Sequence, residues 1–133
     1  AGYRHLTGIE ISKKAIDLGR QTFGNYEIEI INQSVENSFR MLSHFDVIYT
    51  QGCLMHLPPE SEWVFEMISL KARKTIITIE NESWKSLRAW VRNYKTIFEN
   101  LGWVCIDEIS CENYPPLPHV TIRRVFKKGQ EDV

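Results

Sequence analysis

The chain has 133 residues, of which 43% are hydrophobic and 25% are charged, so it has the size and composition of one soluble globular domain. Its formal net charge of −1 provides no electrostatic basis for binding nucleic acid or an anionic membrane surface. No apolar stretch approaches the roughly 20 residues that span a bilayer, no signal-peptide pattern is present, and the cysteines lack close pairs, so we expect a reducing, cytoplasmic setting.

The first half of the chain alternates between strand-like and helix-like segments. In chain order, the sequence predicts a strand over residues 5–11, a helix over 13–23, a strand over 27–32, a short amphipathic helix over 35–42 and a strand over 45–51. Ser12 can cap the first helix, and Gly24-Asn25 can end it. The last of these strands, FDVIYTQ, is apolar enough to be buried on both faces of a sheet.

The second half continues this alternation and then ends in two strands. In chain order, the sequence predicts a helix over residues 58–72, a strand over 74–80, a helix over 83–102, and strands over 103–110 and 119–128. The helix over 83–102 is the longest, because apolar residues recur at helical spacing as far as a stop at Gly102. Residues 129–133 are expected to form a flexible tail.

This order of elements predicts an α/β fold with a mostly parallel sheet. The last two strands are expected to pair antiparallel at one edge of the sheet, since no helix separates them. Ligands of such folds bind beyond the carboxyl ends of the strands. The residues at those ends are Glu10, Ser34, Gln51 and Glu80. We therefore expect a binding site near these side chains.

The strand ends also carry sequence motifs. The segments TGIEIS, INQSVEN, FDVIYTQGCLMHLPPE and KTIITIENES together resemble class I S-adenosylmethionine-dependent methyltransferases of the small-molecule type. The resemblance covers nearly the whole chain and implies a Rossmann-like methyltransferase fold with an antiparallel pair of strands at its end. In that family the first strand lies in the centre of the sheet, between the strands that correspond here to residues 5–11 and 45–51.

The family's first strand and its glycine-rich turn have no counterpart in this sequence. The seven glycines include no two that stand within a G-x-G, although the family packs such a turn against the methionine part of the cofactor. We therefore expect residues 1–128 to form a partial, N-terminally truncated methyltransferase domain. Its binding of S-adenosylmethionine is expected to be impaired.

The resemblance implies roles for residues in the first half of the chain. Glu10 would accept hydrogen bonds from the ribose hydroxyls of S-adenosylmethionine, and Ile11 would flank the adenine. Without the resemblance, Glu10 is equally a solvated acid favoured by the dipole of the next helix. Ser34 and Val35 would lie beside the adenine, although Gln33 or Glu36 could replace Ser34 there, and Ser34 could instead cap the next helix.

Further site residues follow the strand over 45–51. Gln51 and Gly52 would lie under the sulfonium and beside the methyl acceptor, and glycine allows close approach of a ligand to the backbone. His56 would take a proton from a hydroxyl or acid acceptor, as imidazole does near neutral pH, although a lone histidine is more often a structural hydrogen-bonder. Cys53 and His56 have C-x-x-H spacing without a second pair, so no metal site is expected.

The next strand ends in two acidic residues and an amide. Glu80, Asn81 and Glu82 could face an acceptor, but the sequence favours solvated loop charge for them.

Three functions remain open on the sequence. The first is an enzyme that transfers a methyl group to a small-molecule acceptor. The second is a non-catalytic fragment that binds a partner chain or forms homo-oligomers through exposed strand edges; alternatively, residues 5–11 could pair with 45–51 and close the gap. The third, a nicotinamide-binding domain, also requires a glycine loop, and the HLPP stretch argues against it.

Overall fold

The structure, a computed structural model, describes residues 3–24, 27–115, 117 and 120–129. The chain divides into two compact units, residues 1–42 and 43–133, and each is described by itself. Among the described residues, no helix has the length and apolar character needed to cross a membrane.

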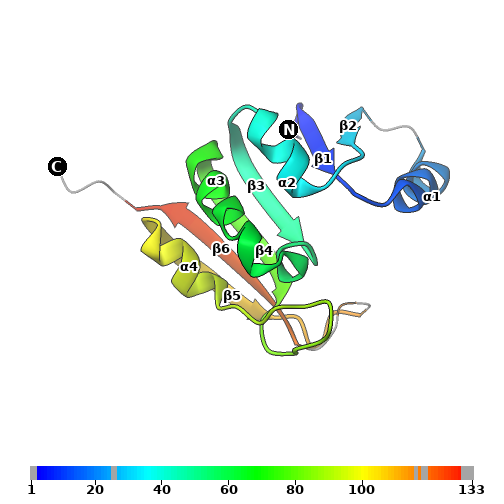
Figure 1. The fold of residues 1–133 in the computed structure, drawn as a ribbon. Coiled ribbons are helices and arrows are strands. Elements are labelled where there is room, and N and C mark those ends of the chain that lie inside the picture. The colour runs from blue at the N-terminus through cyan, green and yellow to red at the C-terminus, as the bar shows by residue number, and fades with distance from the viewer. Residues whose placement is uncertain (1–2, 25–26, 116, 118–119, 130–133) are drawn as a thin grey trace. The chain divides into compact units, whose positions relative to one another are not determined.

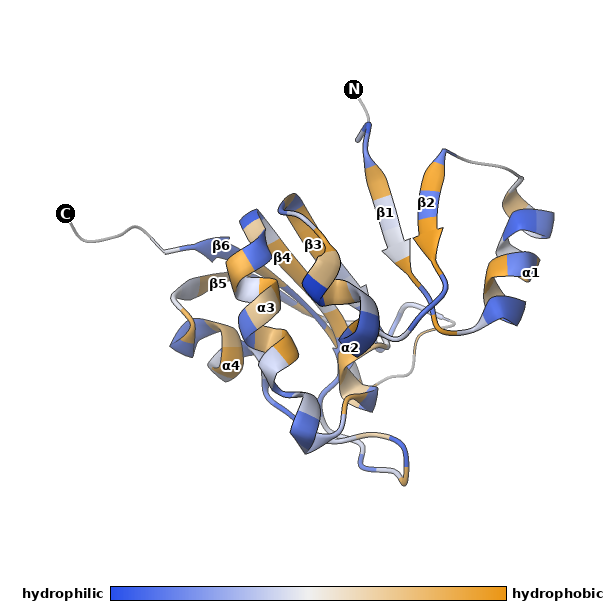
Figure 2. Ribbon diagram, turned by 45° about the horizontal axis from the view of Figure 1, so that its top comes forward, coloured by the Kyte–Doolittle hydropathy of each residue, from blue (hydrophilic) through white to orange (hydrophobic). Residues whose placement is uncertain are grey.

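The first unit contains a small parallel sheet. Its elements are β1 (Leu6–Ile9), α1 (Lys13–Phe23), β2 (Ile28–Ile31), α2 (Val35–Ser38) and the 3-10 turn η1 (Phe39–Met41). β1 pairs with β2 in parallel, from Leu6 opposite Ile28 to Ile9 opposite Ile31. β2 is hydrophobic over most of its length (Figure 2), yet no residue of either strand is fully buried.

The helices of the first unit begin at capping serines. Ser12 Oγ accepts a hydrogen bond from the Ala15 N–H at 3.2 Å, and the Gly24 N–H donates to the Arg20 carbonyl with φ at 79°. The predicted helix over 13–23 is thus confirmed with its cap, while Asn25 lies outside the described residues. The helix predicted over 35–42 is shorter, because it changes to a 3-10 turn after Ser38.

The second unit contains a four-stranded sheet (Figure 1). Its elements are β3 (Phe45–Gln51), the 3-10 turns η2 (Leu54–His56) and η3 (Pro59–Ser61), α3 (Trp63–Lys71), β4 (Ala72–Asn81), α4 (Tyr94–Asn100), β5 (Trp103–Ser110) and β6 (Thr121–Lys128). The strand order is β3-β4-β6-β5. β3 and β4 are parallel, and β6 is antiparallel to both of its neighbours. β3, β4 and β5 therefore run in one direction and β6 in the opposite direction, which confirms the predicted mostly parallel sheet with an antiparallel final pair.

Aromatic side chains form the core of the second unit, where α3 and α4 lie on one face of the sheet (Figures 1 and 2). The ring centroids of Phe98 on α4 and Phe126 on β6 are 5.2 Å apart, and those of Phe65 on α3 and Phe98 are 6.3 Å apart. Phe98 and Phe126 have no exposed surface. Tilted and edge-on rings at such distances attract one another beyond the effect of their buried area.

The long helix predicted over residues 83–102 is wrong for its first half. Helix α4 begins only after Asn93, whose Oδ1 accepts a hydrogen bond from the Thr96 N–H at 3.0 Å. The residues before it form a loop, because their backbone hydrogen bonds go to other segments: the Trp90 N–H donates to the Met55 carbonyl at 2.9 Å. A contact across the fold therefore overrides the local helical pattern.

The expectation that β3 is buried on both faces is also wrong. Tyr49, at its centre, is 65% exposed. β3 pairs with β4 along one edge, and within the described part of the chain its other edge has no strand partner. β1 pairs with β2 inside the first unit, and the alternative in which residues 5–11 pair with residues 45–51 stays a prediction.

The predicted tail over 129–133 lies largely outside the described residues. Gly129 is described, and its N–H donates to the Gly102 carbonyl at 2.9 Å. A Cβ at this position would come within 2.8 Å of the Gly102 oxygen. A glycine therefore permits this close approach after β6.

Candidate functional site

Glu10 lies at the carboxyl end of β1. Its N–H donates to the Ile31 carbonyl at 3.0 Å, which continues the ladder with β2. Its Oε1 accepts the Ser12 N–H at 2.7 Å, immediately before α1. This bond fixes the carboxylate at the amino end of the helix, where the helix dipole favours a negative charge. The described residues provide no hydrogen bond to Oε2, so this oxygen can accept one from a ligand.

Asn32, which sequence reasoning missed, holds the backbone beside Glu10. Its Nδ2 donates to the Glu10 carbonyl at 2.9 Å and to the Ile11 carbonyl at 3.0 Å. A polar residue at the end of β2 was the available signal, because carboxyl ends of adjacent parallel strands meet at one edge. Ile11 is 72% exposed, so its side chain offers an apolar surface next to the Glu10 carboxylate.

Ser34 caps α2, which is one of the alternatives predicted for it. Its Oγ accepts the Asn37 N–H at 3.2 Å, and its carbonyl accepts the Ser38 hydroxyl at 2.8 Å. Val35, the first residue of α2, is half-buried. The first unit thus holds four of the predicted site residues at or just beyond the ends of β1 and β2, and their role toward an adenine stays a prediction.

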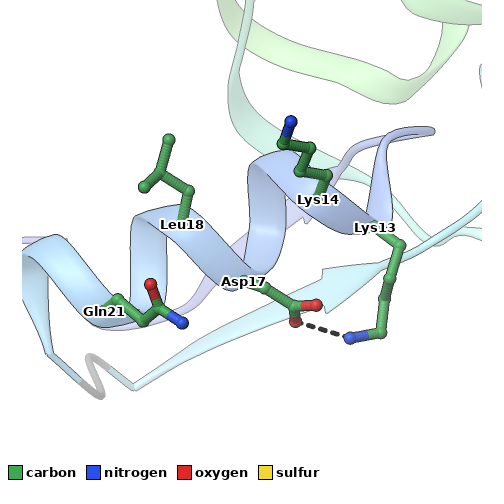
Figure 3. Close-up of a pocket in the computed structure, with 5 residues that line it drawn as sticks. All are labelled: Lys13, Lys14, Asp17, Leu18 and Gln21. Atoms are coloured by element: carbon green, nitrogen blue, oxygen red, sulfur yellow. Dashed lines mark hydrogen bonds and ion pairs between the residues drawn. The ribbon is translucent and has the colours of Figure 1, made fainter.

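A hollow in the same unit lies along α1 (Figure 3). It is lined by Lys13, Lys14, Asp17, Leu18 and Gln21. All five residues belong to a single helix, and an ion pair joins Lys13 to Asp17. None of the predicted site residues lines this hollow, and we assign no function to it.

Gln51 and Gly52 end β3 in the second unit. Gln51 is exposed. Gly52 has φ at 56°, a left-handed conformation that glycine adopts without steric cost. Its N–H donates to the Ile79 carbonyl at 3.0 Å. The chain therefore turns sharply away from the sheet into the segment that carries His56.

Glu80 lies beneath that segment and is completely buried. Its Oε1 accepts the N–H groups of Cys53 and Leu54, both at 3.1 Å, and its Oε2 accepts that of Met55 at 3.3 Å. Burial raises the pKa of Glu80 above its ordinary value, and the backbone hydrogen bonds offset only part of this effect. The expectation of solvated loop charge is wrong here, because the carboxylate faces the interior.

His56 is exposed, and its ring is oriented by one hydrogen bond. Nδ1 bonds to the Arg88 carbonyl. A carbonyl oxygen only accepts hydrogen bonds, so Nδ1 carries the proton in this pair. The neutral ring then has its lone pair on Nε2, which is the nitrogen available to remove a proton from another molecule.

The carbonyl groups of the same loop are also held. Arg92 Nη1 donates to the Leu54 carbonyl at 3.3 Å, and its Nε donates to Glu62 Oε1 at 3.3 Å. The guanidinium lies 5.3 Å from the centre of the Phe65 ring, a distance at which a cation attracts an aromatic face. The Arg92 side chain is buried.

Asn81 and Glu82 are likewise structural. Asn81 Oδ1 accepts the Trp84 N–H at 2.8 Å. Glu82 binds Arg124 with both carboxylate oxygens, at 2.7 and 3.2 Å, and Arg124 also pairs with Glu108. These two acids raise the pKa of Arg124 despite its burial. The side chains of Glu82 and Arg124 are buried, so this ion pair supports the fold and does not face solvent.

Solved structures similar to this one include several methyltransferases. The N-methyltransferase NodS from Bradyrhizobium japonicum WM9 matches with a TM-score of 0.68 and 14% identity, over 95% of this chain and 74% of that chain. Magnesium protoporphyrin IX methyltransferase ChlM from Synechocystis PCC 6803, with bound SAM, matches with a TM-score of 0.66 and 15% identity, over 94% and 60%. A protein assigned as an S-adenosylmethionine-dependent methyltransferase from Listeria monocytogenes matches with a TM-score of 0.75 and 11% identity, over 97% and 82%.

No protein-family model matches this chain, and no curated protein matches its sequence. The structural likenesses show that it has the Rossmann-like fold of class I S-adenosylmethionine-dependent methyltransferases, as the resemblance implied. The chain spans less than two thirds of the length of ChlM.

Proposed function

We propose that this chain is part of an enzyme that transfers a methyl group from S-adenosylmethionine to a small-molecule acceptor. The observation that carries the proposal is the strand order: β1-β2 and β3-β4-β6-β5, with antiparallel β6 between β4 and β5. In the methyltransferase family the corresponding strands belong to one sheet, and the family's first strand lies between the counterparts of β1 and β3. That strand and its glycine-rich turn have no counterpart among these 133 residues.

The residues at the end of β1 fit the cofactor. Glu10 Oε2 can accept the ribose hydroxyls while Oε1 is held by the Ser12 N–H, and the exposed Ile11 side chain can flank the adenine. Ser34 and Val35 are proposed to complete the adenine side. When bound, S-adenosylmethionine supplies an activated methyl group, so that the protein contributes orientation and proton transfer.

The residues after β3 are proposed to serve the acceptor. Gln51 and the turn at Gly52 would line the position of the reacting groups, and His56 Nε2 would take the proton that a hydroxyl or acid acceptor loses. The Arg88 carbonyl holds the ring in the tautomer that this task needs. We place the enzyme in a reducing cytoplasm, in keeping with three cysteines that no disulfide joins.

The proposal is tested by calorimetric titration of the folded chain with S-adenosylhomocysteine. We expect weak binding, because the sequence contains no G-x-G turn, and we expect Glu10→Ala to remove most of the heat. Glu29→Ala is the matched control, since Glu29 is an exposed acid on the adjacent strand β2. Equal heats for wild type and Glu10→Ala, or no heat from the folded wild type, would contradict the proposed cofactor site.

A non-catalytic role is the second candidate, supported by the strand edges. Within the described residues, β1 and β3 each pair along one edge only, and Tyr49 on β3 is 65% exposed. Such edges can pair with another chain. Sedimentation of the titration sample distinguishes the two candidates, because concentration-dependent association without binding of S-adenosylhomocysteine would favour a homo-oligomer or a partner-binding fragment.

A further inference from the structure

The segment that carries His56 is held by its N–H groups from one side. Both oxygens of the Glu80 carboxylate take part: Oε1 accepts from Cys53 and Leu54, and Oε2 accepts from Met55. These three donors are consecutive and lie immediately before His56. A buried carboxylate that accepts several backbone N–H groups restricts all of them at once, because none can leave without a desolvation cost.

The same segment is held by its carbonyl groups from another side. The Leu54 carbonyl accepts from Arg92 Nη1 at 3.3 Å, and the Met55 carbonyl accepts from the Trp90 N–H at 2.9 Å. Close to these contacts, the Arg88 carbonyl accepts from His56 Nδ1. The loop before α4 therefore binds both the backbone of residues 54–55 and the His56 ring. Glu80 on β4 binds the N–H groups of the same backbone segment.

We propose that Glu80 is a positioning residue for His56. By fixing the N–H groups of residues 53–55, it places the imidazole where Nδ1 reaches the Arg88 carbonyl and Nε2 keeps its lone pair. This inference rests on the proposed function, in which Nε2 of His56 accepts the proton of the methyl acceptor. Glu80 itself is buried beneath the loop and touches no reacting group.

The division of donors between the two oxygens provides a sharp test. In Glu80→Gln, the amide oxygen can still accept from Cys53 and Leu54, but an NH2 group faces the Met55 N–H. Two donors then meet, and the Met55 bond is lost. Glu80→Ala removes all three bonds. Glu82→Gln is the matched control, because Glu82 is an acid two residues away whose side chain is buried and accepts from Arg124 and from the Tyr94 N–H, but not from residues 53–55.

The experiment is amide hydrogen exchange of the 133-residue chain by NMR, together with nitrogen shifts of the His56 ring. Exchange is measured relative to Ile76, a fully buried residue of β4, so that a general loss of stability cancels. In Glu80→Gln we expect the Met55 amide to exchange about tenfold faster or more, with Cys53 and Leu54 little changed. In Glu80→Ala all three should accelerate, whereas in Glu82→Gln none should.

The ring signals complete the test. Wild-type His56 should be protonated on Nδ1 when neutral, and Glu80→Ala should shift the ring toward the Nε2–H tautomer. A wild-type ring protonated on Nε2, or tautomer and exchange patterns in Glu80→Gln identical to those in Glu82→Gln, would overturn the inference. If Glu80→Ala does not fold, Glu80→Gln alone decides. These measurements need no cofactor. They therefore test the role of Glu80 independently of the titration with S-adenosylhomocysteine, which tests the cofactor site.

Discussion

At the scale of single residues, the charged groups near the strand ends divide into exposed and buried sets. Glu10 is held by one backbone N–H beside an exposed isoleucine, an arrangement suited to a ligand. Glu80 has no exposed surface and is satisfied by three backbone N–H groups, an arrangement suited to holding a loop. Both are strand-end acids in the sequence, and burial separates their roles.

The buried Glu80 predicts a pH dependence of stability. Burial raises its pKa in the folded state above the ordinary value of 4.5, so the folded chain binds this proton more tightly than the unfolded chain. The contribution of Glu80 to the free energy of unfolding therefore falls as pH rises from about 4.5 through the raised pKa of the folded state. Denaturant titrations of wild type and Glu80→Gln across this range should show the difference.

The relevant quantity is the free energy of unfolding of Glu80→Gln minus that of wild type, because the contributions of the other carboxyl groups are the same in both proteins and cancel. This difference should increase as pH rises, because wild type must then bury the charge of the ionised Glu80, whereas glutamine carries no charge. Glu99→Gln, on the exposed side of α4, is the control. A constant difference between wild type and Glu80→Gln would show that the Glu80 pKa is not raised by folding.

At the scale of elements, the decisive feature is where α4 begins. Residues 83–93 have the apolar spacing of a helix, yet they form a loop that exposes Leu87 fully and Trp84 by 60%. The loop ends at Asn93, whose side-chain oxygen caps α4 by accepting the Thr96 N–H. The position of the cap thus leaves the preceding residues available for their contacts with Met55 and His56.

Replacing this cap should lower stability. Asn93→Ala removes the acceptor of the Thr96 N–H, and loss of an amino-terminal cap costs about 1 kcal/mol. Thermal or denaturant unfolding of Asn93→Ala measures the loss. Asn100→Ala, at the exposed last residue of the same helix, serves as the control. A cost no larger than that of the control would mean that the contacts of the loop, and not the cap, determine where α4 begins.

At the scale of the whole molecule, the two units differ in how much they bury. In the first unit, neither strand of the β1–β2 sheet has a fully buried residue. In the second unit, four strands pack against α3 and α4 around aromatic rings such as Phe98 and Phe126. A two-stranded sheet is marginally stable by itself, so we expect the first unit to be the less stable of the two.

The units should therefore differ in their resistance to local unfolding. In the chain of 133 residues, we expect the amides of β1 and β2 to exchange with solvent at least about tenfold faster than those of β4 and β6, because fewer buried contacts oppose opening. Amide hydrogen exchange resolved by residue checks this directly. Equal protection of the two sheets would mean that the first unit is stabilised to the same extent as the second.

The sequence by itself determined the features that depend on neighbouring residues. Strand-like segments predicted the six strands, Ser12 predicted the start of α1, and the absence of a helix between β5 and β6 predicted their antiparallel pairing. Glu10, Gln51 and Gly52 were predicted to lie at or beyond the ends of strands, and the structure confirms that placement.

Only the tertiary structure decided the features that depend on distant partners. The loop over residues 83–93, the burial of Glu80 and the hydrogen bond between His56 and Arg88 all join segments separated by at least 25 positions in the chain. Local spacing cannot reveal them, because a helical pattern contains no information about a backbone group elsewhere that competes for its N–H and carbonyl groups. The hydrogen bonds available after folding, and not the intrinsic preference of the segment, determine its conformation.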